Sequence, residues 1–188
     1  MDAETVAIVM ALLPAVTLGG LRLAGRRRDA RLWWIAAGFA VSWLANVTAL
    51  AFPPNDRWAP TLVYPVTQVA LIATAFWPRR MVLLLVLDLS AIGLAAIVWR
   101  GLHAPDVVLH SAASLAVVAI VVDRRDASWL VRGSLLIYFG LGLVAWIPHA
   151  MWVHAHPLAH GAAPTYWPYQ GVLLAGLLAF SWVCISDE

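Results

Sequence analysis

The sequence predicts an all-α integral membrane protein with seven transmembrane helices. Of its 188 residues, 63% are hydrophobic and only 12% are charged, whereas a soluble domain carries about 25% charged residues. The apolar residues are also grouped into runs of about 20, the length that a helix needs to cross a bilayer core. A water-soluble chain of this composition would expose large apolar patches, so we expect lipid to surround the helices.

Each apolar run is bounded by residues that end helices. Prolines lie at or between the runs, as helix breakers do, at Pro53, Pro54, Pro78, Pro105 and Pro148. Tryptophans lie near the run ends, where an aromatic belt meets the membrane interface, at Trp58, Trp77, Trp99, Trp129, Trp146 and Trp167. We therefore expect helices over residues 4–24, 31–52, 59–77, 81–99, 106–122, 129–147 and 166–185.

The arginines predict the orientation of the chain in a cell membrane. All 12 basic residues are arginine. Ten fall on one side of the predicted helices, at Arg22, Arg26, Arg27, Arg28, Arg31, Arg79, Arg80, Arg124, Arg125 and Arg132, and only Arg57 and Arg100 fall on the other. Because basic residues gather in cytoplasmic loops, we expect the N-terminus outside and the C-terminus in the cytoplasm.

Short matching stretches indicate an internal repeat. Arg27-Arg28-Asp29-Ala30 precedes the second predicted helix, and Arg124-Arg125-Asp126-Ala127 precedes the sixth. Ala59-Pro60-Thr61 and Ala163-Pro164-Thr165 open the third and seventh. Four helices separate equivalent members, so the two copies would share one orientation. The sequence thus predicts a three-helix repeat over 1–77, a linker helix over 78–102 and a second three-helix repeat over 103–188.

In this 3+1+3 organisation, its size and its expected orientation, the chain resembles the SWEET and PQ-loop-type transporter–opsin–receptor proteins. The resemblance implies two parallel three-helix repeats and a transporter-like function. It covers the whole chain in topology but not in motif, because Ala15 follows Pro14 where the PQ-loop family has a Pro-Gln dipeptide. No binding residues are therefore carried over from that family.

Asp88 is the most informative polar residue inside the predicted membrane region. It lies midway along the fourth predicted helix, where a charge costs on the order of 2.5–3.5 kcal/mol by insertion scales. Such residues mark proton or substrate pathways, or else serve as hydrogen-bonded contacts between helices. His110 enters the fifth predicted helix about one turn from its outer end and is open to the same two interpretations.

Aromatic-proline pairs with a nearby glutamine occur in two predicted helices. Tyr64-Pro65 is followed by Gln68, and Trp167-Pro168 by Gln170. A proline inside a helix releases the carbonyl four residues back, so carbonyls, amides and aromatic faces would be available at one depth, together with Asn46. We expect these groups to line a polar pocket between the repeats, although the alternative is that the prolines only shape the bundle.

Four histidines lie between residues 147 and 166, at His149, His154, His156 and His160. Histidine-rich tracts can bind zinc or copper, but no carboxylate or thiol accompanies these. We therefore favour an unstructured or interfacial loop here over a metal site, for which these four histidines are weak candidates. Because the chain has no lysine, a retinal Schiff base cannot form, and the short arginine-bearing loops do not suit nucleic acid.

Three functions fit these observations. The first is a carrier of a small molecule with a polar pocket between the repeats. The second is a membrane-embedded enzyme that acts on a lipid or isoprenoid through Asp88 or the histidines. The third is a non-catalytic receptor or subunit in a homo-oligomer or larger membrane complex. The paired Pro and Gln elements favour the carrier.

Overall fold

The computed structural model describes residue 17 and residues 29–50, 58–98, 105–156 and 163–186. Every secondary-structure element in these ranges is helical, which confirms the prediction of an all-α protein for this part of the chain. The predicted first helix, 4–24, lies almost wholly outside the described residues. The chain divides into two compact units, Met1–Ala113 and Ser114–Glu188, and each is described by itself.

The helices of the first unit follow the predicted runs closely. A short 3₁₀ turn, η3, joins two of them, and the last helix begins in the first unit and ends in the second. The bounds are α2 Ala30–Leu50, α3 Trp58–Phe76, η3 Pro78–Arg80, α4 Met81–Val98 and α5 Pro105–Asp123. Each helix begins and ends within about two residues of its predicted bounds, the usual uncertainty of a helix end.

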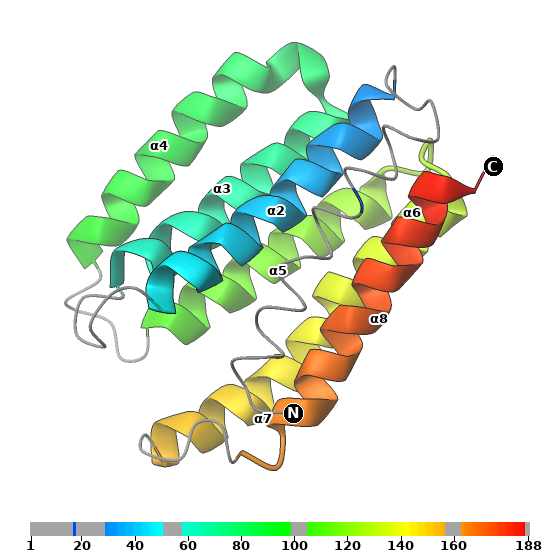
Figure 1. The fold of residues 1–188 in the computed structure, drawn as a ribbon. Helices are drawn as coiled ribbons and strands as arrows, with labels where there is room; N and C mark the ends of the chain where they lie inside the picture. Colours follow the sequence, from blue (N-terminus) through cyan, green and yellow to red (C-terminus); the bar gives the residue numbers. More distant parts are fainter. Residues whose placement is uncertain (1–16, 18–28, 51–57, 99–104, 157–162, 187–188) are drawn as a thin grey trace. The chain divides into compact units, whose positions relative to one another are not determined.

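Helix α3 is the middle helix of the first unit. It packs against α2 on one side and against α4 on the other, as Figure 1 shows. A methyl group added at Gly38 would lie only 3.0 Å from Ile72 Cγ1, so α2 and α3 approach closely. The backbone N–H of Leu32 donates to Asp29 Oδ1 at 3.3 Å, and this side chain thereby caps the start of α2.

The second unit contains one long helix with an irregular middle. Helix α6 (Trp129–Leu135), the π-helical turn η5 (Leu136–Leu141) and helix α7 (Gly142–Ala155) follow one another directly. Ser128 caps α6, since its hydroxyl accepts from the Val131 N–H at 3.3 Å. Asp29 and Ser128 thus cap the helices that follow the two Arg-Arg-Asp-Ala stretches of the sequence, and they are different residue types.

The predicted end of this helix was wrong. Pro148 was expected to mark the boundary after residue 147, but it lies inside α7, which continues to Ala155. A proline removes one N–H and displaces one carbonyl, and apolar helices tolerate this where packed neighbours compensate. The sequence between 147 and 156 is therefore helix and not loop.

Helix α8 (Tyr166–Ile185) packs along α6, η5 and α7. Helix α8 and η5 approach closely at Gly176, where an added Cβ would lie 2.7 Å from Tyr138 Cβ and 2.8 Å from Tyr138 Cα. No other residue fits at this point without movement of a backbone. Small residues allow such close approach between helices of membrane proteins.

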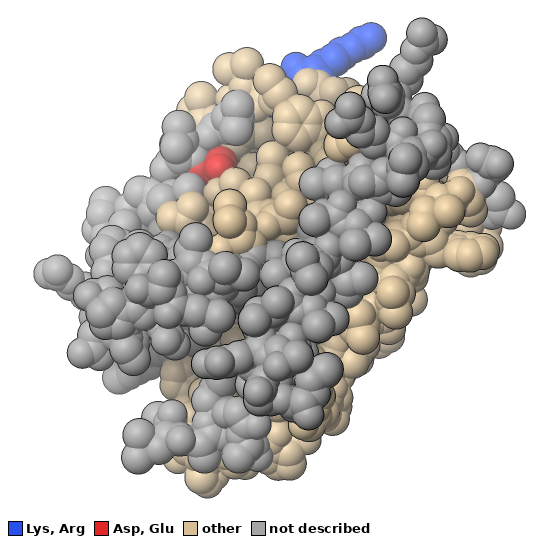
Figure 2. All heavy atoms as spheres, in the orientation of Figure 1, with Lys and Arg blue, Asp and Glu red and all other residues tan. Residues whose placement is uncertain are grey.

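Two described helices, Trp129–Ala155 and Tyr166–Ile185, are long and apolar enough to cross a membrane. Only 33% and 39% of their most apolar windows are buried, less than the core helix of a soluble protein would bury. Helix α8 buries one apolar face and exposes another, which includes Trp167, Leu178, Trp182 and Ile185. In the view of Figure 2, the described surface is mostly uncharged.

Gly176→Ala should destabilise the second unit, because its new methyl group would press on the Tyr138 backbone. Overpacking of this kind costs about 1–3 kcal/mol, which thermal unfolding in detergent would register as a lower melting temperature. Gly171→Ala on the same helix is the matched control, since nothing lies within 4 Å of its added Cβ. Equal melting temperatures for the two variants would contradict the close contact.

Candidate functional site

Helix α3 carries three polar side chains on one face. Tyr64, Thr67 and Gln68 are spaced by three and four residues, which places them side by side along a helix. Gln68 is only 3% exposed, and Pro65 between them is also buried. The usual N–H partner of the Thr61 carbonyl is missing because of Pro65, so the polar face begins at a weakened point of the helix.

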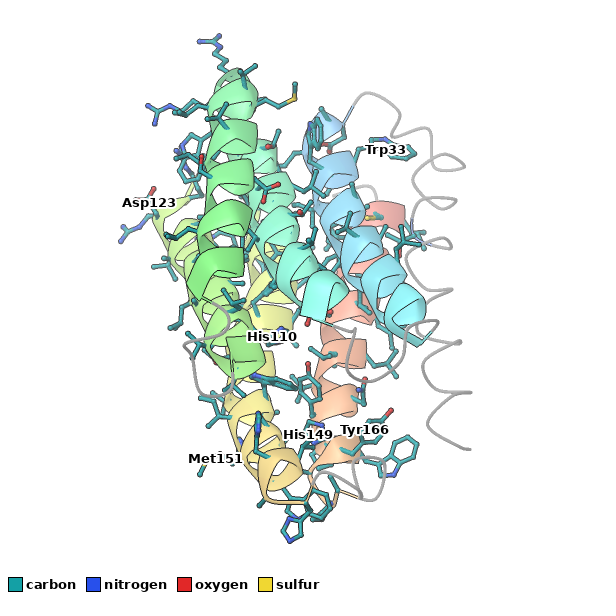
Figure 3. The ribbon with its side chains drawn as sticks, turned by 90° about the vertical axis from the view of Figure 1, so that its left-hand side faces the viewer. Trp33, His110, Asp123, His149, Met151 and Tyr166 are labelled. Atoms are coloured by element: carbon teal, nitrogen blue, oxygen red, sulfur yellow. The ribbon has the colours of Figure 1, made fainter. Side chains whose placement is uncertain are left out.

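The first of these side chains, Tyr64, contacts α5. Tyr64 Oη lies 3.1 Å from His110 Nδ1, within hydrogen-bond distance. The two rings are tilted by 55° with centroids 6.2 Å apart, so the contact is made through the polar atoms and not by stacking. His110 is labelled in Figure 3.

The second of these side chains, Thr67, contacts α4. The Thr67 hydroxyl donates to Asp88 Oδ2 at 3.4 Å, near the upper limit for a hydrogen bond. Asp88 is 8% exposed, although its neighbours Val86 and Leu87 on α4 are exposed. The carboxyl group therefore turns inward from a helix whose outer surface is apolar.

Two buried polar atoms in this group are left without a hydrogen-bond partner among the described residues. They are Gln68 Nε2, a donor, and Asp88 Oδ1, an acceptor when the carboxyl group is ionised. An unsatisfied buried polar group costs free energy, so native proteins keep few of them. Each one calls for an explanation such as a bound water, proton or ligand.

We call Tyr64, Thr67, Gln68, Asp88 and His110 the α3 polar cluster. Four of these residues were candidates from sequence alone, because polar side chains stand out in apolar runs. Thr67 lies at the same depth as these candidates in the sequence, and its position three residues after Tyr64 places it on the same face of α3. All five residues belong to the first unit.

The other predicted site residues lie elsewhere. Gln170 is half-buried and Trp167 is exposed, both on α8 in the second unit. Asn46 lies in α2, with its side chain outside the described residues. The predicted pocket shared by Gln68 and Gln170 stays a prediction.

The second unit holds an aromatic cluster that was not predicted. His149 was expected in a loop, but it lies in α7 and is only 2% exposed. Its Nδ1 lies 3.2 Å from Thr165 Oγ1, and its ring stacks on Tyr169 at 5.4 Å and 15°. Trp146 and Tyr166 complete the surroundings, with centroids 5.9 and 5.8 Å from the imidazole.

His149 therefore has the environment of a packing residue (Figure 3). The other predicted weak metal candidates do not join it in the described part of the chain. His154 and His156 are exposed at the end of α7, where His156 stacks on Trp152 at 4.5 Å, and His160 lies outside the described residues. Within those residues, no three His, Cys, Asp or Glu side chains are placed to hold a metal ion.

Comparison with known protein families, with functionally described proteins and with solved structures gives no match for this chain. The α3 polar cluster and the surface of the helices are therefore the features of this chain that bear on its function. The resemblance to SWEET and PQ-loop-type proteins stays a prediction from topology.

Thr67→Val should weaken the packing of α3 on α4, because it removes the only hydroxyl that donates to Asp88 in the described structure. Hydrogen bonds between membrane helices contribute about 0.6 kcal/mol on average and up to about 1.7. Unfolding in mixed micelles with increasing denaturing detergent would measure the loss. Ser90→Ala is the control, since the Ser90 hydroxyl donates only to the Val86 carbonyl of its own helix. A loss of the same size in both variants would refute the α3–α4 bond.

Proposed function

We propose that this chain is a small multi-pass membrane protein that carries a small polar molecule across the bilayer, with the α3 polar cluster as its binding site. The observation that carries the proposal is the pair of buried, unpartnered atoms, Gln68 Nε2 and Asp88 Oδ1. They offer a donor and an acceptor inside helices whose outer surface is apolar. Polar groups at membrane depth are costly and are most often functional.

Helix length and surface support the membrane part of the proposal. Helices α2, α3, α4 and α5 contain 21, 19, 18 and 19 residues, close to the roughly 20 that a bilayer core requires. On α4, large apolar side chains project outward and are well exposed: Met81, Val82, Leu83, Val86, Leu87 and Leu94. Lipid would cover such a surface. We therefore retain seven spanning helices in two parallel repeats as part of the proposal.

The hydrogen bonds of the cluster join helices. The Thr67–Asp88 and Tyr64–His110 bonds tie α4 and α5 to α3. A carrier needs polar groups that can exchange partners between helices. The long Thr67–Asp88 bond of 3.4 Å suits such exchange.

The proposed orientation places the C-terminus and the Arg79 side in the cytoplasm, following the ten-to-two arginine distribution. In a Cys184→Ala background, His156→Cys should react with a membrane-impermeant maleimide added to intact cells. Arg79→Cys should react only after the cells are permeabilised. Both positions are exposed on the protein, so the membrane alone separates their reactivities. The reverse pattern would overturn the orientation, and equal labelling would overturn the spanning helices between them.

Ligand binding can be tested by thermal unfolding of the purified protein with a panel of amino acids, sugars, nucleosides and organic amines. A solute that binds only the folded state stabilises it by about 2.7 kcal/mol when the solute concentration is about 100 times the Kd. The shift in melting temperature should vanish in Gln68→Leu and in Asp88→Asn and persist in Ser90→Ala. A solute that stabilises all four proteins equally would show that the cluster is not the binding site. Uptake of the same solute into proteoliposomes would then test transport.

A further inference from the structure

Asp88 carries a carboxyl group whose charge no described side chain balances. It lies on α4, about 10 Å along the helix from Met81. In the described part of the chain its side-chain partner is the Thr67 hydroxyl, which is uncharged. The described arginines lie near helix ends or between helices, at Arg31, Arg79, Arg80, Arg124, Arg125 and Arg132. A cation that pairs with Asp88 must therefore come from outside the described residues.

The same carboxyl group can accept more hydrogen bonds than the described residues supply. An ionised carboxylate has two oxygen atoms, each of which can accept more than one hydrogen bond. Asp88 Oδ2 accepts from the Thr67 hydroxyl at 3.4 Å, and the buried Oδ1 has no hydrogen-bond partner among the described residues. A carboxylate in this state suits a group that brings several donors and a positive charge together. A primary ammonium group has three N–H donors and one positive charge.

Other cations fit Asp88 less well than an ammonium group does. Divalent metal ions such as Ca²⁺ and Mg²⁺ take six or more oxygen ligands, whereas the described residues place no three His, Cys, Asp or Glu side chains to hold a metal ion. A bound proton would remove the charge of Asp88 but would not supply a hydrogen-bond partner. An ammonium group does both, and buried charges in proteins are commonly paired in this way.

We propose that the solute of the carrier is an organic ammonium ion and that the Asp88 carboxylate is its counter-ion, held in place by the Thr67 hydroxyl. This inference rests on the proposed function and names its class of substrate. Charge-assisted hydrogen bonds are stronger than neutral ones, and the attraction between opposite charges is larger in apolar surroundings than in water. An amine should therefore bind more tightly than a neutral solute of the same shape.

Matched pairs of solutes test the need for a positive charge at nearly constant shape. The probes are propylamine with propanol, putrescine with butanediol, and benzylamine with benzyl alcohol. Each is titrated calorimetrically into the purified protein at neutral pH and fixed ionic strength. We expect at least one amine to bind, and its alcohol to bind at least about thirtyfold more weakly, as for loss of one partner of a buried charge pair.

Variants of α4 locate the charge that the amine recognises. In Asp88→Asn the affinity for the amine should fall by at least about thirtyfold, whereas Asp88→Glu keeps the negative charge and should bind the amine more tightly than the Asn variant does. Ser90→Ala is the matched control on the same helix, because the Ser90 hydroxyl donates to the Val86 carbonyl, and its affinity should equal that of the unmodified protein. Melting temperatures without solute show whether each variant is folded.

Equal affinities for an amine and its alcohol, undiminished amine binding to Asp88→Asn, or no binding of any amine would overturn the ammonium ion as the solute. The unmodified protein alone gives the first and third of these results, so the test does not depend on folding of the variants. A neutral solute whose stabilising effect vanishes in both Gln68→Leu and Asp88→Asn would reject the ammonium ion and keep the proposed binding site. An amine that binds through Asp88 but is not taken up into proteoliposomes would keep the ion pair and reject the carrier.

Discussion

The first unit depends on how helix α3 satisfies its polar side chains inside apolar surroundings. This helix packs against α2 and α4, and one of its faces carries a phenol, a hydroxyl and an amide. The neighbouring helices supply one carboxyl group and one imidazole for that face. Two hydrogen bonds result, and one donor and one acceptor are left over. Satisfying this donor and this acceptor requires hydrogen-bond partners that the described chain does not provide, such as a water or a bound solute. The proposed binding site follows from this mismatch.

In the second unit, the buried imidazole of His149 has both ring contacts and a hydrogen-bond partner. His149 is enclosed by Trp146, Tyr166 and Tyr169, and it also bonds to the Thr165 hydroxyl. Aromatic rings in tilted and stacked contact contribute packing energy beyond their buried area. This arrangement stabilises the α7–α8 end of the unit through ring contacts and one hydrogen bond.

The helix bounds of the described chain could largely be predicted from the sequence, because the lengths of the apolar runs and the positions of the prolines mark where helices begin and end. Pro148 is the exception. A proline removes one backbone N–H from a helix, but whether the helix continues beyond it depends on packed neighbours that lie far away in the sequence. The site residues Asp88 and His110 were conspicuous for being polar in apolar runs. Their partners Thr67 and Tyr64 depend on how α4 and α5 are rotated against α3, which no local pattern specifies.

The contact between Gly176 and Tyr138 limits the ways in which the second unit can move. On either side of the notch at Gly176, α8 presents buried larger side chains, among them Leu173 and Leu177. Residues on the same face of a helix recur three or four positions apart, so sliding α8 along η5 by about 4.5–6 Å would bring a Cβ against the Tyr138 backbone. Packed helices commonly adjust by small shear movements. The Gly176 contact therefore limits such movement between α8 and η5 to less than one helical turn.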